Sequence, residues 1–166
     1  MGVIYKPSGR AKEYSKEACN VYRGCGHKCK ACWGPSALRM DRETFYNNPV
    51  PRKGILEAIE EEAEELLPSD LESPILLCFT CDSYQPINDI FGITRKALEV
   101  FDRRKLPVQI LTKGGLRAVE DFDILSRNKE NLFAVTLTCD DPAQSLWWEP
   151  NAALPAERIK SLRIAH

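Results

Sequence analysis

The sequence predicts an α/β protein built from about four parallel βα repeats, and three observations support this. Short apolar runs that indicate buried strands recur along the chain, at "PILLCFT", "PVQILT" and "LFAVTLT". Between these runs lie segments with apolar residues at helical spacing. The strand openings near Pro74, Pro107 and Leu132 recur at intervals of roughly 25 to 33 residues, which is the size of a βαβ unit.

Helices are predicted before and between these strands. The segment "GILEAIEEEAEELL" places one apolar stripe on a helix and leaves its Glu run as the solvated face. That stripe comprises Ile55, Leu56, Ile59, Ala63, Leu66 and Leu67. In "GITRKALEVFDRR" the residues at helical spacing are Ile93, Ala97, Leu98 and Phe101. Two further helices are expected at "AVEDFDILSRN" and "AERIKSLRIAH", and a long loop at "CDDPAQSLWWEPNAALP".

Length and charge restrict the class of protein. The 166 residues fit one domain, expected as a polar leader over 1–17 and a core domain over 18–166. The 23 basic and 24 acidic residues give no general attraction to nucleic acid or to an anionic membrane. The longest apolar run, "ILLCF", is too short to cross a bilayer, so a cytoplasmic protein without a membrane partner is expected. Seven cysteines, an odd number, favour thiolate ligands over a disulfide framework.

Three of these cysteines are closely spaced in "NVYRGCGHKCKACWGP". Cys25, Cys29 and Cys32 form the pattern C-x3-C-x2-C. A structural zinc site needs four ligands, and Cys19 or His27 could supply the fourth. An iron–sulfur cluster with three cysteine ligands would keep one iron open for chemistry. Spacing alone favours iron–sulfur over zinc only slightly, and both remain open at this point.

Polar and ionisable residues collect directly after the predicted strands. They are Thr80, Cys81 and Asp82 after one strand, Thr112 and Lys113 after the next, and Thr138, Cys139 and Asp140 after the last. In parallel α/β proteins the carboxyl ends of the strands carry the functional site. These three strand ends are therefore expected to form one pocket.

The cysteine motif and an ordered series of later segments resemble the radical S-adenosylmethionine superfamily, in its spore-photoproduct-lyase-like branch. The segments are "NVYRGCGHKCKACW", "FTCDSYQPINDIFGITRKALEVF", "VQILTKGGL", "DFDILS", "AVTLT" and "WEPNAALPAERIKSLRIAH". They run from about residue 18 to the last residue. The resemblance implies a partial TIM-type barrel and a lyase-like radical enzyme. The branch suggests a DNA-repair lyase, although the balanced charge gives nucleic acid no independent support.

The resemblance implies a [4Fe-4S] cluster ligated by Cys25, Cys29 and Cys32, with S-adenosylmethionine on the fourth iron. One electron from an external reductant of flavodoxin or ferredoxin type would then break the sulfonium C–S bond. The products would be methionine and a 5′-deoxyadenosyl radical that abstracts hydrogen from a substrate. This chain departs from many members by carrying Ala31 before the third cysteine and its aromatic residue, Trp33, after it. That difference leaves the packing over the adenine open.

The resemblance also implies cofactor contacts for four residues after the strands. Thr80 and Asp82 lie where the superfamily holds the methionine amino group, and carboxylate or hydroxyl oxygens suit an ammonium. Lys113 would pair with the cofactor carboxylate, and Thr138 would contact the ribose or the carboxylate. Each has a plainer alternative: Asp82 as a loop cap, Lys113 as a solvated turn residue and Thr138 as the end of a strand.

One glutamate and two cysteines are further candidates for catalysis. Glu149 matches the Glu-Pro signature of the resemblance and either faces the substrate or fixes its loop. Cys81 is a candidate hydrogen donor, and the same role stays open for Cys139. Strand alternation predicts Cys78 and Cys81 on opposite faces, with Cys78 as a buried inert residue. The neighbouring Trp147 and Trp148 are expected to serve packing more than base stacking.

The sequence ends inside a predicted helix after about four βα units, where the superfamily usually builds about six strands. We therefore expect a truncated or split chain, whose last strand is a bare edge and whose barrel a second chain could complete. The alternatives to a radical enzyme are a zinc-stabilised binding module and a catalytically inactive fragment. The substrate stays unnamed by the sequence.

Overall fold

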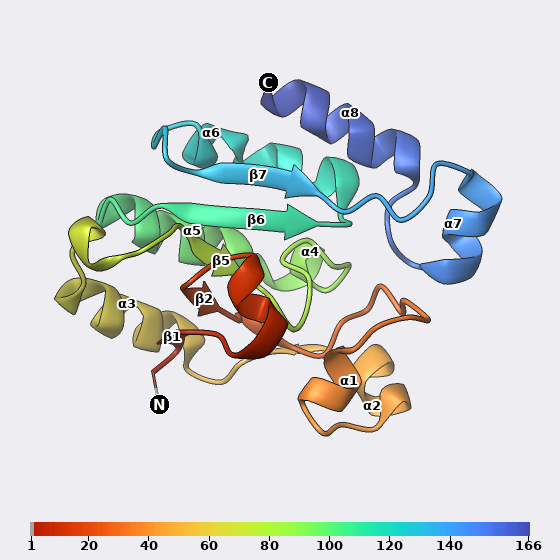
Figure 1. The fold of residues 1–166 in the computed structure, drawn as a ribbon, viewed down its shortest axis with the longest axis horizontal. Helices are drawn as coiled ribbons and strands as arrows, with labels where there is room; N and C mark the ends of the chain where they lie inside the picture. The colour runs from red at the N-terminus through yellow and green to blue at the C-terminus, as the bar shows by residue number, and fades with distance from the viewer. Residues whose placement is uncertain (1) are drawn as a thin grey trace.

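The computed structural model describes residues 2–166, with the side chains of Arg10 and Ala11 left aside. Its centre is a five-stranded sheet in the order β1-β2-β5-β6-β7 (Figure 1). The last four strands in this order are parallel, and β1 pairs with β2 in the antiparallel sense. The α/β class and its parallel strands are thus confirmed. The strands are β1 (Ile4–Tyr5), β2 (Ala18–Cys19), β5 (Ile75–Leu77), β6 (Val108–Thr112) and β7 (Leu132–Val135).

The strand registers bring the carboxyl ends of the parallel strands to one edge. Cys19 lies opposite Leu77, Leu77 opposite Ile110, and Thr112 opposite Val135. In Figure 1 the arrowheads of β6 and β7 point to the end of the molecule where α7 (Pro142–Trp148) and the cysteine loop lie. The cysteine loop is the segment 24–33, which leads into α1 (Gly34–Ala37).

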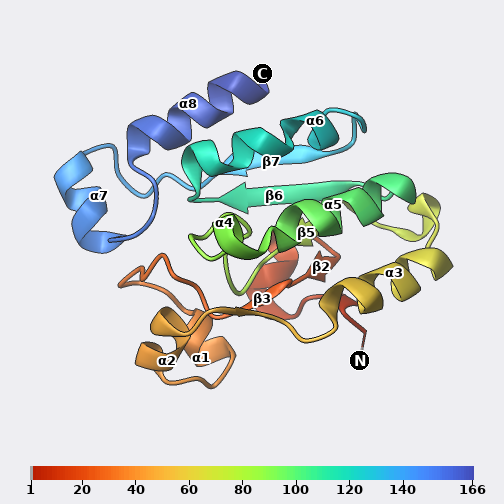
Figure 2. The ribbon, with the colours of Figure 1, turned by 180° about the vertical axis from the view of Figure 1, so that it is seen from behind.

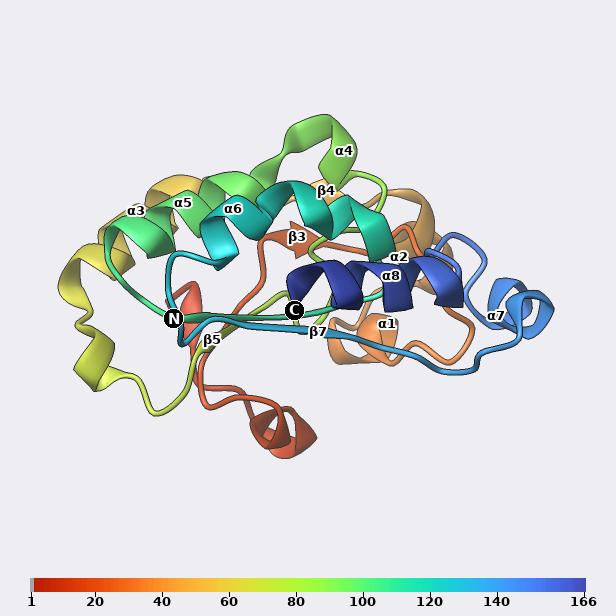
Figure 3. The ribbon, with the colours of Figure 1, turned by 90° about the horizontal axis from the view of Figure 1, so that it is seen from above.

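The longer helices cover one face of the sheet. Figures 2 and 3 show α3 (Ile55–Glu65), α5 (Ile93–Arg103) and α6 (Phe122–Leu125) side by side on that face. The 3-10 turn η1 (Gly9–Glu13) lies on the other face (Figure 3). The C-terminal helix α8 (Pro155–Ala165) packs against the 3-10 helix η3 (Gly115–Asp121) and against β7.

Apolar residues at the predicted spacing build the core. In α3 the buried residues are Ile55, Ile59 and Ala63, and in α5 they include all four predicted positions, Ile93, Ala97, Leu98 and Phe101. They pack against alternate residues of the sheet, which include Ile75, Leu77, Val108 and Ile110. This continuous apolar layer fixes the sheet on which the strand-end residues stand.

The predicted stripe of α3 is wrong at its end. Leu66 and Leu67 both follow the last helical residue and take extended backbone conformations. Leu67 keeps 62% of its surface exposed. Pro68 explains the difference, because a proline disfavours the helical conformation of the residue before it.

Shorter elements fill the segments between these units. The antiparallel pair β3 (Tyr22–Arg23) and β4 (Val50–Pro51) flanks the cysteine loop together with α2 (Arg42–Asn47). The expected long loop after β7 contains α7, whose first turn is capped by Asp141 accepting from Gln144 N–H. The helix expected at "AVEDFDILSRN" divides into η3 and α6. The remaining elements are η2 (Pro68–Asp70) and α4 (Asn88–Phe91).

The predicted polar leader contributes to the sheet through β1. Glu62 of α3 accepts the backbone N–H groups of Val3 and Ile4 at 2.6 and 2.8 Å. Among residues 2–166, no helix has the length and apolarity needed to cross a membrane.

Candidate functional site

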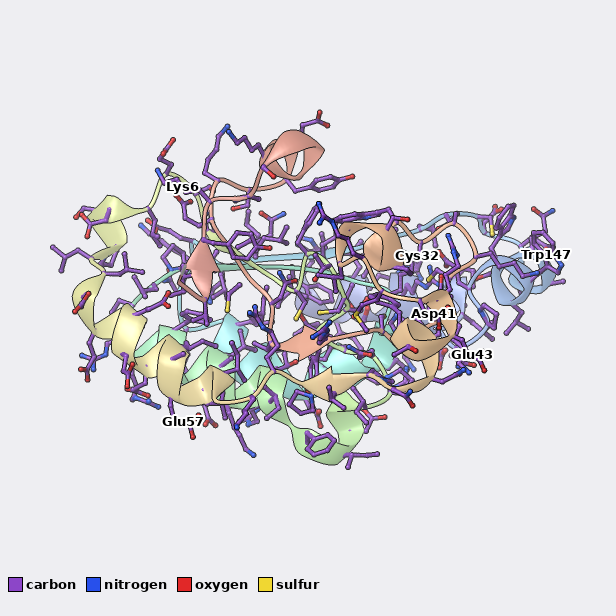
Figure 4. All side chains as sticks on the ribbon, turned by 90° about the horizontal axis from the view of Figure 1, so that it is seen from below. Lys6, Cys32, Asp41, Glu43, Glu57 and Trp147 are labelled. Atoms are coloured by element: carbon purple, nitrogen blue, oxygen red, sulfur yellow. The ribbon has the colours of Figure 1, made fainter. Side chains whose placement is uncertain are left out.

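A cavity of about 250 Å³ lies at the carboxyl ends of the parallel strands. It brings together the three motif cysteines, the strand-end residues and the Glu-Pro glutamate. In Figure 4, Cys32 and Trp147 lie at this same end, away from Lys6 and Glu57. The lining residues are Cys25, His27, Cys29, Ala31, Cys32, Trp33, Gly34, Phe79, Thr80, Cys81, Asp82, Lys113, Thr138, Trp148 and Glu149. The expected single pocket is therefore present, whereas Thr112, Cys139 and Asp140 are not among its lining residues.

The cysteine loop is held by the segment around α2. Cys25 N–H donates to the Phe45 carbonyl at 3.0 Å, and the Tyr46 hydroxyl donates to the Cys29 carbonyl at 2.6 Å. Burial raises the pKa of the Cys25 thiol well above its usual value, and burial raises the pKa of Cys29 to about 11. A bound metal ion would supply the positive charge that reverses both shifts.

The three cysteines share the cavity without forming a ready-made metal cage. Among residues 2–166, no group of three or more His, Cys, Asp or Glu side chains has a metal-binding arrangement. Cys19, the first candidate for a fourth zinc ligand, is fully buried in β2 and does not line the cavity. Cys19 is thus a strand residue, while His27, the second candidate, does line the cavity.

Asp82 links the ends of two neighbouring strands. Its Oδ1 accepts from Tyr84 N–H at 2.9 Å and from the Thr112 hydroxyl at 2.6 Å, and its Oδ2 accepts from Lys113 N–H at 2.8 Å. Burial raises the pKa of Asp82, but the nearby His27 charge and the hydrogen bonds outweigh burial, so the pKa falls below its usual value. Asp82 therefore both caps its loop and presents a carboxylate at the cavity wall.

His27 has one ring nitrogen without a partner. Its side chain is 1% exposed, and its Nδ1 lies 3.5 Å from Asp82 Oδ2. Its Nε2 is buried and makes no hydrogen bond within the described structure. Buried polar atoms are nearly always paired, so a bound group in the adjoining cavity is a natural partner for Nε2.

Glu149 is fixed by three side chains that converge on it. Its Oε1 accepts from the Thr138 hydroxyl at 2.6 Å and lies 3.7 Å from Lys113 Nζ. Its Oε2 forms an ion pair with Arg158 Nη2 at 2.7 Å. Because Glu149 is only 4% exposed, the carboxylate depends on these partners rather than on water. This geometry fits the expectation that Glu149 fixes its loop.

Arg158 is a residue of the site that sequence reasoning missed. It is fully buried on α8, and it also donates Nε to the Ala153 carbonyl at 2.7 Å and Nη1 to the Thr136 carbonyl at 2.9 Å. In sequence it is one of several basic residues on a helix, where an exposed position is the usual expectation. Its only sequence signal is its place nine residues after Glu149.

The strand alternation from which the separation of Cys78 and Cys81 was predicted ends before Cys78. Strand β5 ends at Leu77, and Cys78 takes a left-handed backbone conformation with φ of 68°. Alternation therefore does not apply to this pair, and the neighbouring Cys78 thiol together with burial raises the pKa of Cys81. Cys78 is buried, as expected, while Cys81 lines the cavity.

Aromatic side chains surround the opening of the cavity. Trp33 packs on Phe79 with ring centres 4.9 Å apart and stays 49% exposed. Trp147 and Trp148 meet edge to face at 4.6 Å, and Lys30 Nζ lies 3.3 Å from the centre of the Trp147 ring. The tryptophan pair packs mainly on itself and on Lys30, and both rings remain exposed at 56% and 40%.

Hydrogen bonds join the cysteine loop to the segment after α7. Lys30 N–H donates to the Trp148 carbonyl at 2.8 Å, and Asn151 N–H donates to the His27 carbonyl at 3.2 Å. The Asn151 side chain adds a bond to the Gly26 carbonyl at 2.9 Å. Segments more than a hundred residues apart in the chain thus form opposite walls of one cavity.

Comparison with known proteins gives one distant relative and no family. The chain is 24% identical over 153 residues to a protein of Methanocaldococcus jannaschii named "Uncharacterized protein MJ0683". The match covers 92% of this chain and 56% of that protein, so the chain spans little more than half the length of this relative. No family model matches the chain, and no solved structure matches it.

Proposed function

We propose that this chain is a radical S-adenosylmethionine protein core, in which Cys25, Cys29 and Cys32 hold a [4Fe-4S] cluster. The observation that carries this proposal is the cavity at the strand ends, lined by all three motif cysteines and by the predicted cofactor residues. Carboxyl-end sites are usual for parallel α/β folds, and a partial barrel would extend the same sheet. The reaction and any lyase activity are part of the proposal.

The chemical groups that line the cavity are of the types that would bind the cluster and its cofactor. Four thiols, two carboxylates, two hydroxyls and an ammonium line the same space, and the unpartnered His27 Nε2 lies beside it. The volume is slightly below the range of about 300 to 1,000 Å³ usual for ligand sites. The fit therefore rests on the chemistry of the residues rather than on a preformed cage.

When bound, the cluster and S-adenosylmethionine would supply a reductively generated 5′-deoxyadenosyl radical. The chain's own part is to bind and orient. Thr80 and Asp82 offer oxygen acceptors to an ammonium, while Lys113 and Thr138 offer donors to a carboxylate or ribose. Cys81 at the cavity wall is the proposed hydrogen donor, and the aromatic rim limits the entry of water.

An external reductant of flavodoxin or ferredoxin type and a substrate not yet identified complete the proposal. The branch of the resemblance suggests a nucleic-acid substrate. The share of the relative that this chain leaves uncovered also supports a larger active unit, supplied by further residues or by a second chain.

Anaerobic reconstitution with iron and sulfide tests the cluster directly. We expect a brown protein with charge-transfer absorption and about four irons per chain. Cys29→Ala should abolish the colour, whereas Cys139→Ala, a matched cysteine outside the cavity lining, should retain it. A colourless protein that instead binds one zinc tightly would favour a zinc-stabilised module with His27 as a ligand. Formation of 5′-deoxyadenosine after addition of dithionite and S-adenosylmethionine would then test the reaction.

A further inference from the structure

His27 lies between two of the proposed cluster ligands and forms part of the cavity wall. In the sequence it stands midway between Cys25 and Cys29. Its side chain is 1% exposed, and the residue lines the same cavity as the three motif cysteines. Its buried Nε2 has no hydrogen-bond partner among the described residues, which is rare because the lost hydration is then not replaced. This nitrogen therefore calls for a partner that the described side chains do not supply.

The backbone around His27 is held from two sides. The fully buried Gln85 accepts the Gly26 N–H at 2.8 Å and donates its side-chain N–H to the Gly24 carbonyl at 3.2 Å. Asn151 donates its backbone N–H to the His27 carbonyl at 3.2 Å and its side-chain N–H to the Gly26 carbonyl at 2.9 Å. The unpartnered Nε2 thus belongs to an anchored part of the cysteine loop.

Asp82 determines which ring nitrogen of His27 carries the proton. The Nδ1 atom lies 3.5 Å from Asp82 Oδ2. A carboxylate favours a proton on the nitrogen that faces it, so Nδ1 is protonated and Nε2 of the neutral ring presents a lone pair. Histidines that bind metal ions almost always have their other ring nitrogen bonded in this way, often to a carboxylate. The pairing with Asp82 therefore prepares Nε2 to act as a ligand.

The two hydroxyls that line the cavity are engaged elsewhere. The Thr80 hydroxyl donates to Asn20 Oδ1 at 3.0 Å, and the Thr138 hydroxyl donates to Glu149 Oε1 at 2.6 Å. Because a hydroxyl has a single proton, neither can also donate to the His27 lone pair. Iron is a metal that imidazole nitrogen binds well, and three thiols line the same space.

We propose that His27 Nε2 is a fourth protein ligand of the cluster, which binds the iron left open by the three cysteines until S-adenosylmethionine displaces it. This role of His27 rests on the proposed function, because it requires the cluster. A [4Fe-4S] cluster takes one protein ligand on each iron, so its ligands stand farther apart than those of a single ion. That separation agrees with the lack of a single-ion cage among residues 2–166. The displacement exchanges ligands only and changes no oxidation state.

Isotope labelling can detect this ligand directly, because the chain has only two histidines, His27 and His166. His166 is exposed and directly follows α8. The full chain, without a histidine tag, is produced with 15N-histidine and all other nitrogen at natural abundance. It is reconstituted anaerobically with iron and sulfide and reduced with dithionite. Pulsed electron paramagnetic resonance should then show a 15N coupling as large as that of the histidine ligands in Rieske-type centres.

Two variants and the cofactor complete the experiment. His27→Gln should retain the cluster, since the three cysteines remain, but should lose the 15N coupling. His166→Gln is the matched control and should retain both. Excess S-adenosylmethionine at natural isotope abundance should remove most of the coupling from the wild-type protein, with its binding measured in parallel by equilibrium dialysis.

Three results would overturn this role of His27. One is a reduced cluster in the wild-type protein without a 15N coupling of that size. Another is a coupling that survives in His27→Gln, because His166 would then be its source. The third is an undiminished coupling in protein that has bound S-adenosylmethionine. A chain that forms no cluster would instead contradict the proposed function itself, so the two failures are distinguishable.

Discussion

At the scale of single residues, the availability of the Lys113 ammonium to a ligand depends on which partners the surrounding carboxylates already have. Asp82 is occupied by two backbone N–H groups and the Thr112 hydroxyl. Glu149 pairs closely with Arg158 at 2.7 Å and only loosely with Lys113 at 3.7 Å. The Lys113 ammonium, 23% exposed, thus keeps donors free for an anion in the cavity.

Replacing this ammonium should therefore weaken the binding of an anionic ligand. We expect Lys113→Met to raise the Kd for S-adenosylmethionine by roughly ten- to a hundredfold, as expected for the loss of a hydrogen bond to a charged group. Equilibrium dialysis of the reconstituted protein measures this change. Lys96→Met removes a lysine from the surface of α5 and should leave the Kd unchanged. Equal affinities of wild type and Lys113→Met would rule out the predicted carboxylate contact.

Breaking the Glu149–Arg158 pair should cost much stability, because both charges are buried. Arg158→Met leaves Glu149 without its closest cation, and we expect a loss of about 3 to 5 kcal/mol in the free energy of unfolding. Adding Glu149→Gln should recover part of this loss, because the uncompensated charge is then removed. Urea unfolding of both variants tests the expectation, with Arg163→Met as the exposed control on the same helix. Similar stability of the Arg158 and Arg163 variants would contradict it.

The sequence predicts some residues of the site and misses others for a physical reason. Thr80, Asp82, Lys113 and Thr138 were predictable because residues that follow parallel strands meet at one edge. The role of Arg158 was not, because the burial of an arginine depends on a carboxylate and on carbonyls that other elements supply. The left-handed turn at Cys78 depends on one backbone angle that no residue pattern encodes.

At the scale of elements, the spacing of apolar residues and the composition predict long helices and strands better than short ones. The helix α5 has four predicted apolar residues at helical spacing, and all four are buried. The helix α7 was missed because its seven residues show no apolar period, although Asp141 and Pro142 are a suitable capping pair. Strand β1 in the leader was not predicted either, because its two residues are too few to show strand alternation.

The strand β1 depends on a side chain of a helix. Glu62 accepts the N–H groups of Val3 and Ile4, so Glu62→Ala should cost about 1.5 to 3 kcal/mol and release this strand first. We expect faster hydrogen exchange at these two amides, while the amides of β6 stay protected. Glu61→Ala removes an exposed carboxylate from the same helix and serves as the control. Unchanged exchange at Val3 and Ile4 in the Glu62 variant would show that β1 is held by its pairing with β2 alone.

At the scale of the whole molecule, the cavity depends on contacts between distant parts of the chain. The cysteine loop supplies one wall, and the segment after β7 supplies another through Thr138, Trp148 and Glu149. Between them run bonds from Lys30 to Trp148 and from Asn151 to His27 and Gly26. The sheet aligns the strand ends, but these bonds set the distance between the walls.

Loss of one of these bonds should loosen the cysteine loop without unfolding the protein. Asn151→Ala removes the bond to the Gly26 carbonyl, at a global cost of about 0.5 to 1.5 kcal/mol. Because the bond joins the two walls, we expect severalfold faster hydrogen exchange over residues 24–32 and a lower iron content after reconstitution, with β6 unaffected. Asn48→Ala, an exposed asparagine near α2, should change neither quantity. If both variants behave alike, the segment after α7 does not support the cysteine loop, and the loop is held by its contacts with Phe45 and Tyr46 instead.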